Sequence, residues 1–174
     1  MYMQCTNSGN LSASDLCLLD SILEWYNEDK CRVDKFVDVV RRKNGTSLRI
    51  IDWLVTNFSK VHSVAMNSSG LPRDLSRNYQ MNLTAYNKKN MDPFARRNKI
   101  KICVFGREER SSTVGQLNFF RWFYKNGVDV YLNKHRDVVE CHMKENEGKE
   151  HLIKARGGRC FAVKSFSGSF RMTF

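Results

Sequence analysis

The side chains with the clearest chemical potential form a basic run in the middle of the 174-residue chain. Residues 88–101 contain six cations and a single carboxylate, Asp92. Cations neutralise phosphates and release counterions, and the interleaved rings of Tyr86 and Phe94 can stack on bases. A solvated loop with Phe94 packed into the core explains the pattern equally well. The candidate nucleic-acid-binding residues are Lys88, Lys89, Arg96, Arg97, Lys99 and Lys101, with Arg121 as an addition.

Two further segments could contact an anion, and each has a simpler structural explanation. The stretch from Lys144 to Arg171 is basic, and the Gly157-Gly158 pair within it could approach a phosphate backbone closely, although a plain turn is favoured. Thr113 to Gly115 precede an apolar helix whose N-terminus could hold an anion. The Walker pattern is absent, and a T-x-x-Q capping box ending at Gln116 accounts for these residues.

No catalytic or metal-binding signature is present in the sequence. The six cysteines include no C-x-x-C pair, and His135 and His142 are seven residues apart rather than at the four-residue spacing of a metal pair. No nucleophile elbow or paired-aspartate motif occurs. We therefore expect no catalytic residues, no metal and no cofactor, and we favour a protein that is not an enzyme.

Composition bounds the class of protein and its partners. A net charge of +11 attracts nucleic acid, anionic membrane or acidic protein. The first twenty residues lack a secretion signal, so the cysteines are expected to be free thiols in a reducing compartment. No stretch approaches the length of an apolar membrane span, which predicts no membrane partner.

The predicted elements place the basic run between two strands. Residues 1–12 are expected to be loose, and three helices are expected over residues 13–60, where apolar residues recur at helical spacing. Alternation predicts strands at residues 61–66, 79–85 and 100–104, with residues 110–114 pairing back as a hairpin. Helices should follow from Thr113 and from Val128, and a closing hairpin should end the chain.

These elements predict an α+β fold, with an N-terminal three-helix unit followed by a small antiparallel sheet and two further helices. Residues 13–174 are expected to form one domain, with a helical subregion over 13–60 and a mixed α+β subregion over 61–174.

Three stretches together resemble a known family. They are Ser47–Lys60 (SLRIIDWLVTNFSK), Leu83–Arg97 (LTAYNKKNMDPFARR) and Thr113–Trp122 (TVGQLNFFRW). They are similar to small uncharacterised proteins of nucleocytoplasmic large DNA viruses, such as iridoviruses, marseilleviruses and algal viruses. The resemblance implies a virus-encoded protein acting in an infected cell or virion, and it carries no assigned catalytic residues.

The sequence favours a nucleic-acid-binding accessory or virion-core protein that contacts mainly phosphate. DNA is the expected partner ahead of RNA, and other virion proteins are possible partners. The expected location is the infected host cytoplasm, a viral factory or the virion, without secretion. Two alternatives are a structural protein that bridges capsid or core components, which predicts an exposed aromatic patch, and a divergent enzyme, which predicts a polar cleft.

Overall fold

The computed structural model describes residues 1–41, 43, 45–66 and 73–155. Its helices are α1 (Ala13–Glu28), α2 (Lys30–Val40), α3 (Leu48–Trp53), the π-helix η1 (Leu54–Phe58), α4 (Ser59–Val61), α5 (Leu75–Tyr86), the 3₁₀ helix η2 (Lys88–Asn90), α6 (Val114–Lys125) and α7 (Val128–Ala155). Its strands are β1 (Met3–Asn7), β2 (Ala65–Met66), β3 (Arg73–Asp74), β4 (Ile100–Val104) and β5 (Glu108–Ser112). The predicted α+β class is confirmed.

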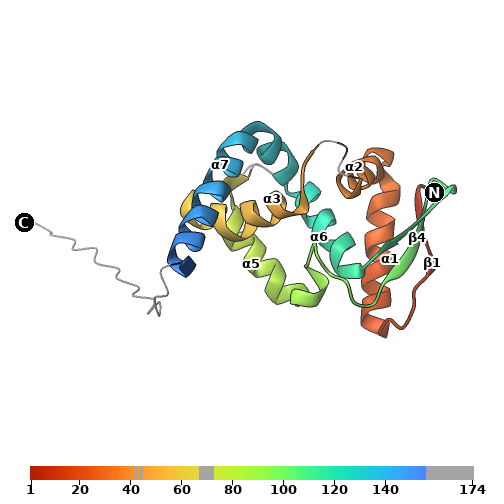
Figure 1. Cartoon of the computed structure of the whole chain (residues 1–174). Helices are drawn as coiled ribbons and strands as arrows, with labels where there is room; N and C mark the ends of the chain where they lie inside the picture. Colours follow the sequence, from red (N-terminus) through yellow and green to blue (C-terminus); the bar gives the residue numbers. More distant parts are fainter. Residues whose placement is uncertain (42, 44, 67–72, 156–174) are drawn as a thin grey trace, which may run out of the picture.

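Helix α6 occupies the middle of the molecule. It lies between α1 with the larger sheet on one side and α3, α5 and α7 on the other (Figure 1). Phe119, Phe120 and Phe123 of α6 are almost fully buried, and their rings contact one another and the rings of neighbouring elements. The sequence predicts an apolar helix here, and its burial on nearly all sides explains that composition.

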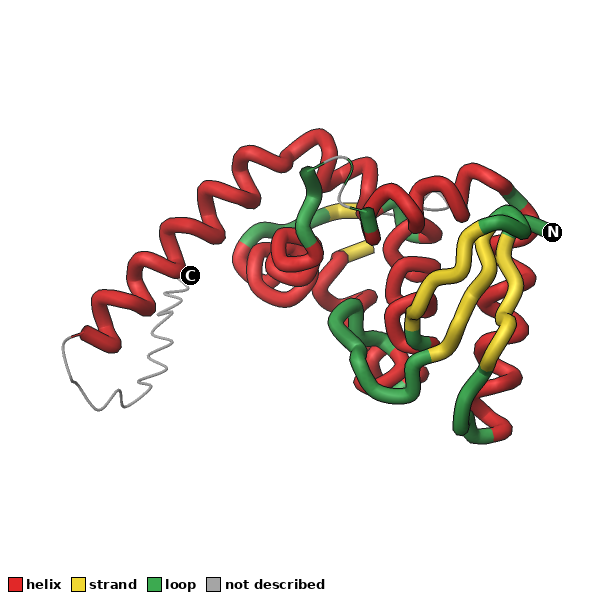
Figure 2. Tube along the Cα trace, turned by 45° about the vertical axis from the view of Figure 1, so that its right-hand side comes forward, coloured by secondary structure: helices red, strands yellow, loops and turns green. Residues whose placement is uncertain are grey.

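The larger sheet is antiparallel, in the order β1-β4-β5, and forms an outer layer next to the helices (Figure 2). Strand β4 lies in its centre and alternates as predicted, with Ile100, Ile102 and Val104 buried and Lys101 exposed. The predicted hairpin with the following strand is confirmed, because Ile102 pairs with Arg110 of β5.

The prediction of a loose N-terminus over residues 1–12 is wrong for residues 3–7, which form the edge strand β1. Met3 is buried, and Cys5 pairs with Ile102 of β4. Asn27 of α1 holds the strand in place: its Oδ1 accepts from the Met3 amide at 2.9 Å, and its Nδ2 donates to the Met3 carbonyl at 2.7 Å. The pairing partner lies far away in the sequence, so local composition could not indicate this strand.

The strand predicted at residues 79–85 is instead part of helix α5. Leu75 and Tyr79 are buried and Leu83 packs against the core, whereas Met81 is 65% exposed. Positions separated by four residues satisfy both the helical and the strand period, so the alternation was ambiguous. Asp74 starts the helix by accepting a hydrogen bond from the Arg77 amide at 2.8 Å.

Three smaller predictions have mixed outcomes. The strand predicted at residues 61–66 is limited to Ala65–Met66, because Val61 ends helix α4 and is exposed. The helices predicted from Thr113 and Val128 are confirmed, the latter with a non-helical residue at His135. The predicted closing hairpin and the Gly157-Gly158 turn lie outside the described residues.

The segment between α5 and β4, residues 87–99, is the basic loop, and it includes the short helix η2. Its backbone carbonyls fix it to α6 and α5. Asn118 of α6 donates to the Asn90 carbonyl at 2.8 Å, and Gln116 donates to the Pro93 carbonyl at 3.1 Å. The Tyr79 hydroxyl of α5 donates to the carbonyl of Met91, whose side chain is fully buried. The loop therefore has a defined shape despite its irregular backbone.

Gly115 permits the closest approach between this loop and α6. A Cβ atom at position 115 would lie 2.3 Å from the Lys89 carbonyl oxygen, far inside van der Waals contact. The absence of a side chain in the first turn of α6 thus determines how near the basic loop can lie.

We predict that Asn27→Ala lowers the free energy of unfolding by about 1–3 kcal/mol, because it removes the side chain that pairs with both polar groups of Met3. Urea denaturation measures the effect. Gln4→Ala, at an exposed position of the same strand, serves as the control and should change stability by less than about 0.5 kcal/mol. Equal stability of the two variants would contradict this role of Asn27.

The Gly115→Ala variant tests the close contact, because two effects predict stability changes of opposite sign. Helix propensity alone would make alanine more stable by about 1 kcal/mol, whereas the steric conflict with the Lys89 carbonyl should destabilise the protein by about 1–3 kcal/mol. Thermal and urea unfolding measure the sign, with exposed Asn133→Ala on α7 as the control. A more stable Gly115→Ala variant would refute the close contact.

Candidate nucleic-acid interface

The structure brings three of the predicted cations to one cavity of about 600 Å³. Lys89, Arg96 and Arg97 line it together with Phe94. The lining also includes Asp92 and residues near the start of α1 and α6, namely Leu11, Asp15, Thr113, Val114 and Gly115. The volume lies within the usual range of ligand sites, about 300–1,000 Å³.

Arg96, Arg97 and Lys99 are exposed cations, and none of them forms an ion pair or a side-chain hydrogen bond with another described residue. They follow one another on the segment that leads from the anchored loop into β4. The positive charge of these three side chains is therefore available to an external anion.

The other predicted site residues of this stretch are partly compensated. Lys89 pairs with Asp15 at 3.1 Å, and Lys101 of β4 pairs with Glu109 of β5 at 3.5 Å. Lys101 and Glu109 are both well exposed, so that pair is worth little and leaves the lysine accessible. Lys88 lines a separate cavity of about 410 Å³ that also contains Asp52 and Asp92.

The carboxylates explain why Lys88 differs from the other cations of the run. Burial raises the pKa of Asp52, the nearby Asp92 charge raises it further, and Lys88 opposes both effects. The lysine is thus positioned beside two carboxylates, which would compete with a phosphate for its charge.

Arg121 lies apart from the loop, in a polar cavity of about 520 Å³ between α1, α5 and α6. Its guanidinium donates to Ser21 at 3.1 Å and to Asn118 at 2.7 Å and lies over the Tyr86 ring. Burial lowers the pKa of Arg121, and Tyr86 counteracts this shift. Sequence reasoning grouped Arg121 with the loop, but its side chain faces a different cavity.

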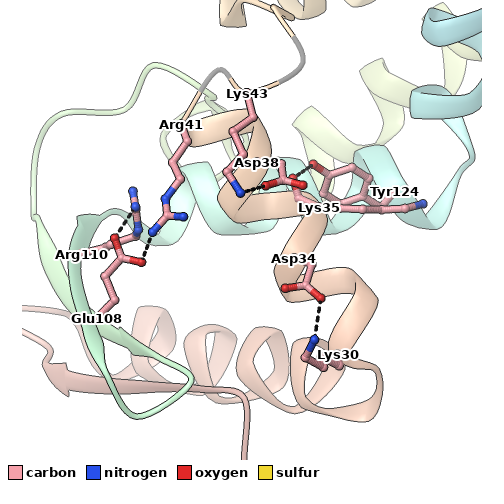
Figure 3. A network of polar contacts seen from close by, with 9 residues as sticks. All are labelled: Lys30, Asp34, Lys35, Asp38, Arg41, Lys43, Glu108, Arg110 and Tyr124. Carbon is pink, nitrogen blue, oxygen red and sulfur yellow. Dashed lines mark hydrogen bonds and ion pairs between the residues drawn. The ribbon is translucent and has the colours of Figure 1, made fainter.

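Cations elsewhere in the described structure show the contrast, because many are neutralised within the fold. At the end of α2, Arg41 and Arg110 both bind Glu108, and Lys43 pairs with Asp38 at 3.1 Å (Figure 3). Arg41 and Lys43, which follow α2, are thus used in ion pairs inside the protein, consistent with a structural role for these two cations.

Asp15, which sequence reasoning did not select, organises the basic loop. Its carboxylate is 7% exposed and accepts hydrogen bonds from Asn90 at 2.9 Å and from Lys89 at 3.1 Å. The bonds from Asn90 and then Ser12 lower the pKa of Asp15, burial opposes them, and Lys89 adds to the lowering. Its position in the first turn of a capped helix was the signal available in the sequence.

Of the two hydrogen bonds that make up the predicted capping box at Thr113, the one to the threonine hydroxyl is present. The Thr113 hydroxyl accepts from the Gln116 amide at 3.1 Å. The Gln116 side chain does not complete a reciprocal box, because it accepts from Ser112 and donates to Pro93 in the basic loop. The capping residue of α6 and the loop are therefore part of one hydrogen-bonded assembly.

Three other observations limit the chemistry of the described residues. No group of three His, Cys, Asp or Glu side chains among them is arranged to hold a metal ion. No described helix combines the length and the apolar composition needed to cross a bilayer. Cys5, Cys17, Cys31, Cys103 and Cys141 are unpaired, and Cys17, Cys31 and Cys141 are exposed.

The chain belongs to a family described as "Family of unknown function (DUF7197)", whose profile matches residues 5–159. It is 27% identical over 152 residues to the "Uncharacterized protein L507" of Acanthamoeba polyphaga mimivirus. The match covers 82% of this chain and 59% of that relative, so the chain spans well under two thirds of the relative's length. No solved structure matches. A resemblance to an uncharacterised viral family is thus confirmed.

We predict that Asp15→Ala lowers the free energy of unfolding by about 2 kcal/mol at neutral pH, because Asn90 and Lys89 lose a buried charged acceptor. A lowered folded-state pKa means that this stabilisation is full above the unfolded pKa of about 4 and fades as the pH falls through the folded value. Urea denaturation between neutral pH and acid should therefore show a shallower decline for the variant.

Asp20→Ala provides the matched control, since Asp20 is exposed on the same helix. It should retain the wild-type decline of stability in acid. An Asp15→Ala variant with an unchanged acid profile would show that the carboxylate does not stabilise the folded loop.

Proposed function

We propose that this member of the DUF7197 family binds nucleic acid, with DNA as the preferred partner, mainly through phosphate contacts. The observation that carries the proposal is the set of exposed cations without an ion pair, Arg96, Arg97 and Lys99, on an anchored loop. Lys89 at the cavity and the accessible Lys101 extend the positive surface.

The anchoring supports the proposal energetically. A loop that is ordered before binding loses less conformational entropy when it takes up a ligand. The backbone of the loop is fixed at Asn90, Met91 and Pro93, immediately before the cations. The net charge of +11 adds a long-range attraction for polyanions.

The viral resemblance supplies the setting for this proposal. The mimivirus relative is a viral protein, and we extend the proposal to an accessory or virion-core protein encoded by a nucleocytoplasmic large DNA virus. Such a protein would act in the infected cytoplasm, in a viral factory or within the virion, where it would meet viral DNA and other virion proteins.

The alternative of a bridging structural protein predicted an exposed aromatic patch. Tyr2 and Phe94 are the aromatic side chains among the exposed large hydrophobic residues of the described structure. Tyr2 contacts Phe105 near the sheet, whereas Phe94 lies at the basic cavity. This distribution favours the nucleic-acid proposal.

A charge-matched pair of variants tests the proposal. Arg96, Arg97 and Lys99 are replaced together by alanine, and the control replaces exposed Arg77, Arg107 and Lys134, which also removes three positive charges. Fluorescence anisotropy with a short labelled duplex DNA, between about 50 and 200 mM salt, measures the affinity. The slope of the logarithm of the binding constant against the logarithm of the salt concentration should become shallower by about 3 for the Arg96, Arg97 and Lys99 variant. This corresponds to about 1 for each lost phosphate contact.

The control variant should retain most of the wild-type slope. Undetectable DNA binding by the wild-type protein at low salt would overturn the proposal. Equal loss in the loop variant and the control would also overturn it, because binding would then follow net charge rather than this loop.

A further inference from the structure

The aromatic ring of Phe94 stands on the surface at the basic cavity. It is 41% exposed, and it forms no ring contact with another aromatic residue in the described part of the chain. Of the two alternatives left open by the sequence, the one in which Phe94 packs into the core is therefore wrong. Single exposed apolar side chains are common on protein surfaces, but Phe94 stands at a cavity that is also lined by Arg96 and Arg97, and this combination is the starting point for a binding role.

The backbone presents this ring in a defined position. The Asp92 carboxylate accepts a hydrogen bond from the Phe94 amide at 2.8 Å, and the Asp92 carbonyl accepts from the Ala95 amide at 3.2 Å. One residue earlier, the Pro93 carbonyl is held by Gln116 of α6. The turn that carries Phe94 is thus tied down directly before the ring.

The cavity combines surfaces of two kinds. Leu11, Phe94, Ala95 and Val114 give the lining its apolar part. Its charged part consists of Arg96, Arg97, the Lys89–Asp15 ion pair and the Asp92 carboxylate, which together leave a net positive charge. A nucleotide has the same two parts, a flat apolar base face and an anionic phosphate. Its chemistry matches the two kinds of lining.

We propose that Phe94 is a stacking platform for an unpaired base of single-stranded DNA, while Arg96 and Arg97 hold the adjoining phosphates. This inference rests on the proposed function, and it adds the strand form that the site prefers. In a duplex both faces of each base are covered by its neighbours, so a side chain on a protein surface cannot stack on them without flipping a base out. In a single strand the base faces are available.

The order of residues suits this arrangement. Phe94 is separated from Arg96 by one residue, and Arg97 and Lys99 follow on the way to β4. Stacking on an aromatic ring is tolerant of base identity, because every base has a π-face. The site should therefore bind single strands with little sequence preference.

A thermodynamic cycle tests the inference with the full-length protein. Wild type, Phe94→Ala and Phe94→Trp are titrated with a labelled single strand of mixed sequence and with an abasic strand that keeps the same phosphates. Phe94→Ala should bind the base-bearing strand at least about fivefold more weakly than wild type does. Phe94→Trp keeps an aromatic ring at this position and should bind the strand about as tightly as wild type. On the abasic strand, Phe94→Ala and wild type should bind equally.

Two controls keep the result specific to the ring. Met81→Ala removes another exposed apolar side chain, on α5, and should leave the affinity unchanged. Thermal unfolding should show that Phe94→Ala remains fully folded at the temperature of the binding assay, because the ring is 41% exposed and its loss leaves no closed cavity in the core. The slope of affinity against salt should also be unchanged, since no phosphate contact is lost.

The outcomes separate this inference from the proposed function. If Phe94→Ala binds the base-bearing strand as tightly as wild type while the Arg96, Arg97 and Lys99 variant binds more weakly, stacking is refuted and phosphate binding stands. If Phe94→Ala weakens binding of the base-bearing and the abasic strand equally, the ring does not stack on a base and the inference also fails. If wild type binds none of the strands at low salt, both proposals fail.

Discussion

The buried carboxylate of Asp15 is the interaction on which the arrangement of the basic loop depends. It joins the first turn of α1 to Lys89 and Asn90, which lie more than seventy residues later in the chain. Without it, a lysine and an amide would lose their shared buried acceptor. The carboxylate offsets the charge of Lys89, whereas Arg96, Arg97 and Lys99 have no ion pair with another described residue.

The distribution of charge over the fold is therefore more informative than its total. The chain carries a net charge of +11, yet the cations of α2 and β5 shown in Figure 3 are bound to carboxylates of the same molecule. Exposed ion pairs of this kind contribute little to stability. Their main effect is to neutralise the region where α2 ends beside β5, whereas Arg96, Arg97 and Lys99 have no ion pair with another described residue.

Sequence reasoning was accurate where the signal was local. The alternation in Ile100–Val104 and the hydroxyl of Thr113 each depend on residues a few positions away, and both predictions are confirmed. It failed where the partner was distant, as in β1, whose pairing strand begins at Ile100. The segment 79–85 failed for another reason, because its apolar spacing fits two periods and burial of Tyr79 in a helix decided between them.

The candidate site was predictable in composition but not in arrangement. The run of cations could be read directly, whereas the separation of Arg121 and Lys88 into other cavities depends on how α5 and α6 pack. The sequence also could not decide whether Phe94 is exposed, because the same ring could have filled the core. Gly115 gave no sequence signal of its own, because its importance lies in the Lys89 carbonyl that approaches it.

The pairing of β1 with β4 also has a consequence for how the protein reaches its folded state. Residue 5 pairs with residue 102, so the sheet is completed by one of the least local contacts in the chain. Contacts of this kind require closure of a long loop and form slowly, whereas the hairpin of β4 and β5 closes through a short turn. Until β1 docks, β4 keeps an open edge, and an open edge is where strands of other molecules can pair during refolding of the chain.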